Sequence, residues 1–260
     1  DNAMEIRSIG IIGAGQMGNG IAHVTALAGY RVVMMDISQD SLTAALSLIE
    51  KNLERQVSSA KITAAEKAKA LAQIDTTLDI SKVGQADLVI EAATEDETIK
   101  QSIFDLLLPH LQDHTILTSN TSSISITRLA SRTDRPEKFM GFHFMNPVPV
   151  MKLVELIRGI ATDETTYAAC KQVVERLGKT AASAEDFPAF IVNRLLMPMI
   201  NEAVYTLYEG VGNVVSIDSS MRLGANHPMG PLELADFIGL DTCLAIMNVL
   251  HDGLADTKYR

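Results

Sequence analysis

The sequence predicts an α/β fold, in which a doubly wound sheet carries a helical-hairpin arm and is followed by a smaller all-α domain. Three observations lead to this prediction. Short apolar runs alternate with helical patterns up to residue 185, a glycine cluster joins the first run to the first helix, and helical patterns alone occupy residues 186–260. We therefore expect two domains, at residues 4–185 and 186–260.

The first predicted element is a buried strand over Ile9–Ile12, a short apolar and β-branched run. The segment Gly13–Gly18, with the sequence GAGQMG, follows it at once and opens a helix. Gly29 ends that helix, and Arg31–Met35 forms a second apolar strand that stops at Asp36. This order of elements, with an acid at its end, is typical of a dinucleotide-binding unit.

Dinucleotide binding accounts for each of these residue types. Gly13 permits a tight turn, Gly15 lets a pyrophosphate approach the backbone, and Gly18 lets the helix pack closely on the strand. The helix N-terminus offers free N–H groups and the positive end of its dipole to the phosphates. Asp36 can accept hydrogen bonds from both ribose hydroxyls and would repel a 2′-phosphate, so the sequence predicts a Rossmann-type unit that prefers NAD to NADP. The loop residues assigned to the cofactor are Gly13, Gly15, Gln16, Met17 and Gly18.

The stretch after Asp36 predicts a pair of helices that is longer than an ordinary crossover. Apolar residues from Leu42 to Leu53 recur on one face of the first helix. Thr63, with Glu66 three residues later, forms a capping box at the start of the second. The pair is either an extra packing layer or an arm over the substrate, and its mixed charges are also typical of a solvated face.

Two further strands are predicted at residues 86–92 and 115–120, with a helix between them. The second of these strands ends in a polar cluster, residues 119–123, with the sequence SNTSS. Ligands of open parallel sheets bind beyond the carboxyl ends of the strands, so this cluster is a candidate ligand site. Capping of the helix that runs through Leu129 is the alternative role, and we expect it for some of the five residues.

A single histidine lies near the end of an apolar strand, Phe139–Phe144. Residues 146–147 break this strand, and Lys152–Ile157 forms the next one with Glu155 inside it. A short turn makes the two strands antiparallel neighbours, so His143 and Glu155 can meet, and a buried glutamate needs such a partner. A lone histidine on an apolar face is more often a satisfied core residue than a catalyst, so the residues alone leave both roles open for His143.

Residues 186–260 predict a helical domain. Asp186 caps its first helix, Pro188 sits in the first turn, and further helices cover 216–223 and 231–250. Asn193 is polar on a mostly apolar helix, where a helix-packing hydrogen bond would also explain it. A segment of about 75 residues has a marginal core of its own, so its methionine- and leucine-rich faces predict packing against a second copy.

Composition narrows the classes of function. The formal charge of −10 and a pI of about 5.0 argue against a nucleic-acid partner. No run of 18 apolar residues predicts a membrane span, and no signal peptide is visible, so we expect a cytoplasmic protein. Cys170 and Cys243 are in no metal-ligand spacing, and no metal is expected. We interpret the three residues before Met4 as a remnant of expression.

Five blocks, taken together, resemble the 3-hydroxyacyl-CoA dehydrogenase family, most closely its bacterial members that act on 3-hydroxybutyryl-CoA. They are GAGQMGNGIA, SNTSS, GFHFMNPVPVMKLVE, FIVNRLL and HPMGPLELADFIGLD. The resemblance covers residues 5–258. It implies an oxidoreductase that transfers hydride between NAD and the 3-position of a short-chain acyl-CoA, and a homodimer joined through the helical region.

The resemblance also implies roles for single residues. His143 would be the general base, and Glu155 would orient its ring and stabilise the cation. Ser122 and Asn193 would hydrogen-bond the reacting oxygen and the thioester end. The positions that match contacts to the ribose and nicotinamide side of NAD are Glu95, Lys100 and Asn146.

Two features depart from the family pattern. The positions in the arm that contact CoA fall on Asn52 and Ser59, where serine and lysine are expected, and Lys61 is a substitute cation. Family chains also continue beyond Arg260 with a glycine-rich tail that ends in an aromatic residue, so we expect this chain to be truncated there.

Two alternatives remain. A β-hydroxyacid dehydrogenase of the 6-phosphogluconate type also begins with G-x-G-x-M-G, but its site resembles a lysine-based one and its substrate lacks CoA. Lens λ-crystallin, an NAD-binding structural protein, is similar to the same family. The set of Ser122, His143, Glu155 and Asn193 favours an enzyme over a structural role.

Overall fold

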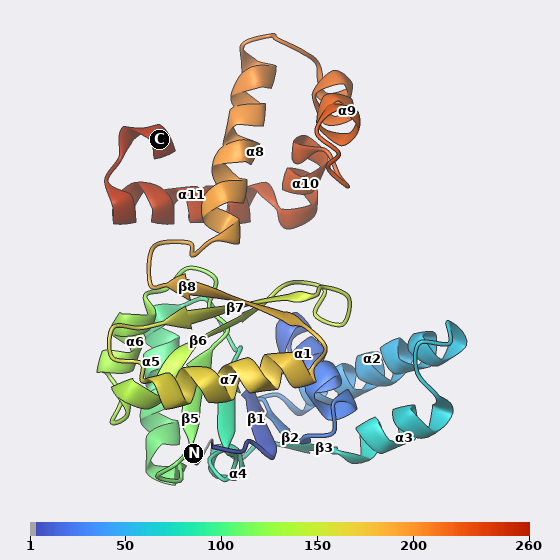
Figure 1. Ribbon diagram of the computed structural model, residues 1–260, viewed down its shortest axis with the longest axis vertical. Coiled ribbons are helices and arrows are strands. Elements are labelled where there is room, and N and C mark those ends of the chain that lie inside the picture. Colours follow the sequence, from blue (N-terminus) through green and yellow to red (C-terminus); the bar gives the residue numbers. More distant parts are fainter. Residues whose placement is uncertain (1–3) are drawn as a thin grey trace. The chain divides into compact units, whose positions relative to one another are not determined.

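The structure is a computed structural model that describes residues 4–260, so the three residues that we interpreted as a remnant of expression lie outside it. The chain divides into two compact units, one that ends at Asp186 and one over Phe187–Arg260 (Figure 1). The first unit is built on one eight-stranded sheet with the order β3-β2-β1-β4-β5-β6-β7-β8. The second unit is helical.

The strands of the sheet agree with the six predicted ones and add two. They are β1 (Ser8–Ile12), β2 (Arg31–Met35), β3 (Ile74–Thr77), β4 (Leu88–Glu91), β5 (Ile116–Ser119), β6 (Phe139–Phe144), β7 (Leu153–Arg158) and β8 (Thr180–Glu185). The helices of this unit are α1 (Gln16–Leu27), α2 (Gln39–Ser58), α3 (Ala64–Ala72), α4 (Ile80–Val83), α5 (Glu97–Leu107), α6 (Ile126–Ser131) and α7 (Glu164–Arg176), with short 3-10 turns at Leu108–His110 and Pro136–Lys138.

The sheet is mostly parallel and doubly wound. Of the strand pairs in the described residues, β6 and β7 alone are antiparallel. The carboxyl ends of β1, β4, β5 and β6 therefore meet at one edge, where the glycine loop, the serine cluster and the histidine follow their strands. The order reverses between β1 and β4, which is where open α/β sheets bind ligands.

The helical pair after β2, which we call the arm, packs on α1 and so forms the extra packing layer that was one of the two alternatives; a role over the substrate stays a prediction. Figure 1 shows α2 and α3 side by side, extending away from the sheet at its β3 end. The predicted apolar face of α2 is buried, with Leu42, Ile49 and Leu53 fully enclosed and in the same core cluster as α1. The Oγ1 atom of Thr63 accepts a hydrogen bond from the N–H of Glu66 at 3.1 Å, which confirms the predicted cap of α3.

The second unit consists of α8 (Val192–Tyr208), α9 (Val214–Gly224), α10 (Pro231–Ile238), α11 (Leu240–Leu254) and a final 3-10 turn (Thr257–Tyr259). The helix expected over 231–250 is broken at Gly239, whose φ of 102° interrupts it between α10 and α11. Within residues 4–260, no single helix is long and apolar enough to cross a bilayer. The helices α10 and α11 reach that length and apolarity only when they are taken together, and they are bent by 98° relative to each other.

The expected role of Asp186 as the cap of the first helix in this unit was wrong. Its carboxylate instead accepts hydrogen bonds from the Oγ of Ser125 and from the N–H groups of Ile126 and Thr127, at 2.8 to 2.9 Å. These donors lie at the N-terminus of α6, where free N–H groups attract an acceptor. The first helix of the second unit begins only at Val192.

Candidate active site

The loop between β1 and α1 has the backbone that a dinucleotide requires. Gly13 has a φ of +105°, and a Cβ on Gly18 would lie 1.7 Å from the carbonyl oxygen of Gly13, so neither position tolerates a side chain. A Cβ on Gly15 would meet no atom of the described residues within 4 Å, which leaves the backbone open to a phosphate. Gly15 is also the N-cap of α1 and has no side chain to satisfy the first N–H groups of the helix. The loop therefore fits the pyrophosphate of a dinucleotide.

Asp36 follows β2 and is tied to this loop. Its Oδ2 accepts a hydrogen bond from the N–H of Ala14 at 2.9 Å, and its Oδ1 accepts one from Ser38 at 3.0 Å. A carboxylate has about four lone-pair sites, so roughly two remain for ribose hydroxyls. The aspartate thus has both the position and the free acceptor capacity to bind the ribose next to the phosphates.

The histidine and the glutamate meet as the sequence predicted. His143 on β6 and Glu155 on β7 face each other across the antiparallel pair, and Nδ1 of His143 lies 2.9 Å from Oε2 of Glu155. His143 is 7% exposed and Glu155 is 0% exposed, so water screens this contact little. If Nδ1 carries the hydrogen that it shares with the carboxylate, a neutral ring has its lone pair on Nε2. Such a ring can accept a proton at Nε2 while the carboxylate stabilises the resulting cation.

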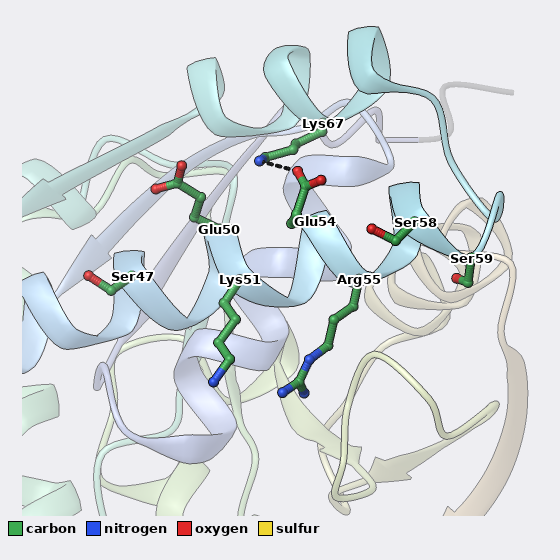
Figure 2. Close-up of a pocket in the computed structure, with 8 residues that line it drawn as sticks. All are labelled: Ser47, Glu50, Lys51, Glu54, Arg55, Ser58, Ser59 and Lys67. Atoms are coloured by element: carbon green, nitrogen blue, oxygen red, sulfur yellow. Dashed lines mark hydrogen bonds and ion pairs between the residues drawn. The ribbon is translucent and has the colours of Figure 1, made fainter.

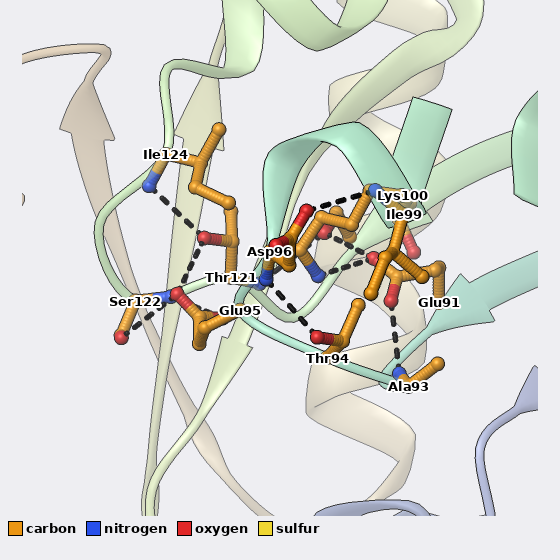
Figure 3. Close-up of polar contacts among 12 residues, drawn as sticks. Glu91, Ala93, Thr94, Glu95, Asp96, Ile99, Lys100, Thr121, Ser122 and Ile124 are labelled. Atoms are coloured by element: carbon orange, nitrogen blue, oxygen red, sulfur yellow. Dashed lines mark hydrogen bonds and ion pairs between the residues drawn. The ribbon is translucent and has the colours of Figure 1, made fainter. Parts of the chain in front are cut away.

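The serine cluster after β5 is organised around Glu95 (Figure 3). The hydroxyls of Thr121, Ser122 and Ser123 contact the Glu95 carboxylate at 3.1 to 3.4 Å, and the N–H of Ser122 lies 3.4 Å from it. Thr121 also accepts from the N–H groups of Ser123 and Ile124, which lie before α6. The N-cap of α6 is Ser125, so the expectation that residues of the cluster cap this helix was wrong. Ser122 is thus placed beside the acid that was expected to contact the cofactor.

Lys100 lies deeper than a surface contact to ribose would suggest. Its Nζ is 2.5 Å from Oε1 of Glu91 at the end of β4, and the two side chains are 1% and 0% exposed. Glu91 also accepts hydrogen bonds from Ser119 and from the N–H of Ala93. Glu91 therefore links the ends of β4 and β5 to α5.

Sequence reasoning missed both Glu91 and the role of Asn120. A charged residue that ends an otherwise apolar strand was the available signal for Glu91. Asn120, from the cluster after β5, accepts a hydrogen bond at Oδ1 from the N–H of Phe144 at 2.8 Å. It thereby holds the end of β6 next to His143. Asn146 lies two residues after the end of β6, at the same edge of the sheet.

A cleft of about 460 Å³ separates α1 and α2 from the turn after β6. It brings together the arm positions expected to contact CoA, and its lining contains two cations and several amides but, among the described residues, no acid. In a chain with a net charge of −10, this is a local excess of positive charge. The lining residues are Gln16, Asn19, Gly20, His23, Leu48, Asn52, Arg55, Gln56, Ser59, Lys61 and Pro147–Val150.

The outer surface of the arm separates its charges. Figure 2 shows Lys51 and Arg55 pointing to one side of α2, whereas Glu50 and Glu54 point toward α3. Lys67 of α3 forms an ion pair with Glu54 at 2.7 Å. Arg55 lines both this surface and the cleft, so the cationic side of α2 continues into the cleft. The charges of this helix are therefore arranged by sign, which a merely solvated face does not require.

Asn193 belongs to the second unit. It is the second residue of α8 and is partly buried. The structure therefore brings His143, Glu155 and Ser122 to the same sheet edge of the first unit, whereas Asn193 lies in the second unit.

A glycine loop with an acid after β2, beside a buried histidine–carboxylate pair, defines a dinucleotide-dependent oxidoreductase as the class of this protein. Matches to two protein-family models assign the protein more narrowly within this class. "3-hydroxyacyl-CoA dehydrogenase, NAD binding domain" matches residues 8–187, and "3-hydroxyacyl-CoA dehydrogenase, C-terminal domain" matches residues 190–260. The chain belongs to the 3-hydroxyacyl-CoA dehydrogenase family.

Individual relatives agree with this assignment. The chain is 62% identical over 258 residues to a 3-hydroxybutyryl-CoA dehydrogenase of Bradyrhizobium diazoefficiens, covering 99% of this chain and 88% of the relative. It is 51% identical to a probable 3-hydroxybutyryl-CoA dehydrogenase of Bacillus subtilis, covering 99% and 90%. The crystal structure of (S)-3-hydroxybutyryl-CoA dehydrogenase from Ralstonia eutropha superposes with a TM-score of 0.96 at 49% identity, covering 98% of this chain and 90% of that one.

These comparisons confirm four expectations from the sequence: the family, the α/β fold with a helical second part, the oxidoreductase class and NAD as the cofactor. The individual site residues stay proposals.

Proposed function

We propose that this enzyme interconverts 3-hydroxybutyryl-CoA and acetoacetyl-CoA with NAD, and that His143 is its general base. The observation that carries the proposal is the buried contact of 2.9 Å between His143 and Glu155 at the edge of the sheet that also holds the glycine loop. The relatives named above, which share up to 62% identity, support the choice of a four-carbon substrate.

The proton step follows from the geometry of the pair. In the oxidation, Nε2 of His143 takes the proton of the 3-hydroxyl group, and the ring becomes positive. Glu155 cannot exchange its partner for water because it is buried, so its charge stays directed at that ring. The Oγ of Ser122 would orient the reacting oxygen, and the assignment of Asn193 to the thioester end rests on the family resemblance. When NAD is bound, it would accept the hydride from the 3-carbon of the substrate.

The cofactor would be held by residues from four strand ends. The backbone of Gly13, Gly15 and Gly18 receives the pyrophosphate, flanked by Gln16 and Met17. Asp36 accepts hydrogen bonds from the adenine-side ribose. Three residues remain assigned to the other half of the cofactor: Glu95, Lys100 and Asn146. The buried pairing of Lys100 with Glu91 suggests that Lys100 orders the loop of Glu95 as well.

The cleft beside the arm would take the CoA portion of the substrate. Asn52 and Lys61, the sequence-based candidates, both line it, and Arg55 adds a second cation. Amide side chains can pair with the amides of a pantetheine chain, and cations with its phosphates. We infer that the departure from the family pattern at residues 52 and 59 is compensated by Arg55 and Lys61.

We further propose that the protein is a cytoplasmic homodimer joined through residues 186–260. Apolar side chains such as Tyr208, Val211 and Leu223 are largely exposed in the second unit, and such patches are typical of interfaces. Light scattering at micromolar concentration should give twice the mass of 28.2 kDa. A stable monomer would contradict the dimer but not the enzymatic proposal.

The activity can be tested by following NADH absorbance with acetoacetyl-CoA as substrate. We expect NADH oxidation, and a much lower kcat/KM with free acetoacetate, which lacks the CoA portion. Tight NADH binding without turnover of any 3-ketoacyl-CoA would instead support a structural role of the λ-crystallin type.

A further inference from the structure

The turn between β6 and β7 forms one wall of the cleft and makes few hydrogen bonds of its own. It contains Pro147 and Pro149, which have no N–H to donate. Its internal bonds run from the N–H groups of Val150 and Met151, both to the carbonyl oxygen of Pro147, at 3.0 to 3.1 Å. The position of this wall therefore depends on contacts from outside the turn.

Lys179 supplies two of those contacts. Its Nζ donates to the carbonyl oxygen of Val148 at 2.7 Å and to that of Met151 at 2.5 Å. Lys179 directly precedes β8, and the next residue, Thr180, donates from its N–H to the carbonyl oxygen of Lys152 at 2.7 Å. Partial burial, together with repulsion from the ammonium group of Lys152, lowers the pKa of Lys179.

The opposite side of the turn rests on α1. The side chain of Val148 is 2% exposed, and a Cβ on Gly20 would lie 2.8 Å from its Cβ, so the turn already sits as close to α1 as the packing permits. The side chain of Val148 thus packs against α1, and its carbonyl oxygen accepts a hydrogen bond from Lys179. A substitution that removes the Lys179 ammonium group removes its two hydrogen bonds to the turn but leaves the contact with α1. We therefore expect the turn to move away from α1 and the cleft to widen.

We propose that Lys179 is a positioning residue for the acyl-CoA substrate, because it fixes the cleft wall against which the CoA portion lies. The inference rests on the proposed assignment of this cleft to CoA. The register between His143 and Glu155 is set by the ladder of β6 and β7, not by the turn, so the proton chemistry should not depend on Lys179.

The test compares two substrates on each variant: acetoacetyl-CoA and acetoacetyl-N-acetylcysteamine, a thioester that lacks most of the CoA portion. Lys179→Met should lower kcat/KM for acetoacetyl-CoA by about tenfold or more, mainly through KM, because it removes two charge-assisted hydrogen bonds from the wall. The short thioester should keep its kcat/KM within roughly twofold. Lys179→Arg, which keeps a cation with several donors, should restore part of the loss. Lys171→Met, an exposed lysine on α7, is the matched control and should change neither substrate.

Each other outcome contradicts the proposal. Equal losses for both substrates, counted per molecule that binds NADH, would make Lys179 a general structural residue. Failure of Lys179→Met to fold would assign the lysine to stability instead of positioning. The assignment of the cleft to CoA is tested separately by the wild-type enzyme: if it does not prefer acetoacetyl-CoA to the short thioester, the proposed function of the cleft fails before any variant is measured.

Discussion

Replacing His143 by alanine is the most direct test of the proton step. The variant removes the ring that lies 2.9 Å from Glu155, at a site where His143 is 7% exposed. Loss of a general base typically costs about 10²–10⁴ in rate. We therefore expect kcat to fall by that factor while NADH binding stays, because the glycine loop and Asp36 are untouched.

The companion variant Glu155→Gln gives the size of the charge effect. Glutamine keeps nearly the same volume and still offers an oxygen to Nδ1 of His143, but it carries no charge. A hydrogen bond to a charged partner contributes about 1 kcal/mol more than a neutral one, which is roughly fivefold in rate. The loss in Glu155→Gln should therefore be real but much smaller than that in His143→Ala.

The assay is the initial rate of NADH oxidation with acetoacetyl-CoA, divided by the amount of protein that binds NADH. His114→Ala is a matched control, because Nε2 of His114 lies 2.8 Å from a carboxylate oxygen of Asp87 on the surface of the same unit. It should leave kcat unchanged. Wild-type turnover per folded molecule in His143→Ala, with only a lower Tm, would make His143 a core residue and refute the reasoning.

Three more predictions concern the cofactor loop and stability. The wild-type enzyme should prefer NADH to NADPH at least tenfold, because repulsion between Asp36 and the 2′-phosphate of NADPH exceeds about 1.4 kcal/mol. Asp36→Ala should reduce the ratio of kcat/KM for NADH to kcat/KM for NADPH. Equal kcat/KM values for the two cofactors in the wild type would contradict this prediction. Gly15→Ala should keep the Tm but weaken NADH binding. Gly18→Ala should lower the Tm and weaken NADH binding, because the new Cβ would overlap the carbonyl of Gly13. Calorimetry measures the Tm and titration measures NADH binding, and a Gly18→Ala variant with an unchanged Tm would show that the loop is not closely packed. Burial lowers the pKa of His23 from its ordinary value of 6.5. As the pH falls, the histidine is therefore protonated in the unfolded chain before it is protonated in the folded one. The free energy of unfolding should then decrease below about pH 6.5, by at most about 1.4 kcal/mol per pH unit. His23→Gln should flatten that part of the denaturation curve, and an unchanged slope would exclude His23 as its cause.

The parts of the site that could be predicted from the sequence are those encoded by consecutive residues. The loop from Gly13 to Gly18 and the acid at position 36 are recognisable because turn geometry, helix start and strand end follow one another in the chain. The pairing of His143 with Glu155 was also predictable, since a short turn between two apolar strands permits only an antiparallel neighbour.

Elements without a strong apolar pattern escaped prediction. The edge strand β3, with the sequence IDTT, and the edge strand β8, with the sequence TAASAE, contain few large apolar residues. An edge strand packs on fewer neighbours than a central one, so its side chains need not follow the alternation that marks buried strands. Only the completed sheet shows that both segments belong to it.

By itself, the sequence determined the class of fold, the dinucleotide loop and a set of candidate catalytic residues, because these depend on local geometry and on residue type. The tertiary structure alone decided which polar groups meet across long distances in the chain. Lys179 holds a carbonyl 31 residues away, and Asp186 caps a helix about 60 residues earlier. Such partners are selected by packing, since a buried charge accepts whichever donor or acceptor the fold brings within reach, and no local pattern of residues records that choice.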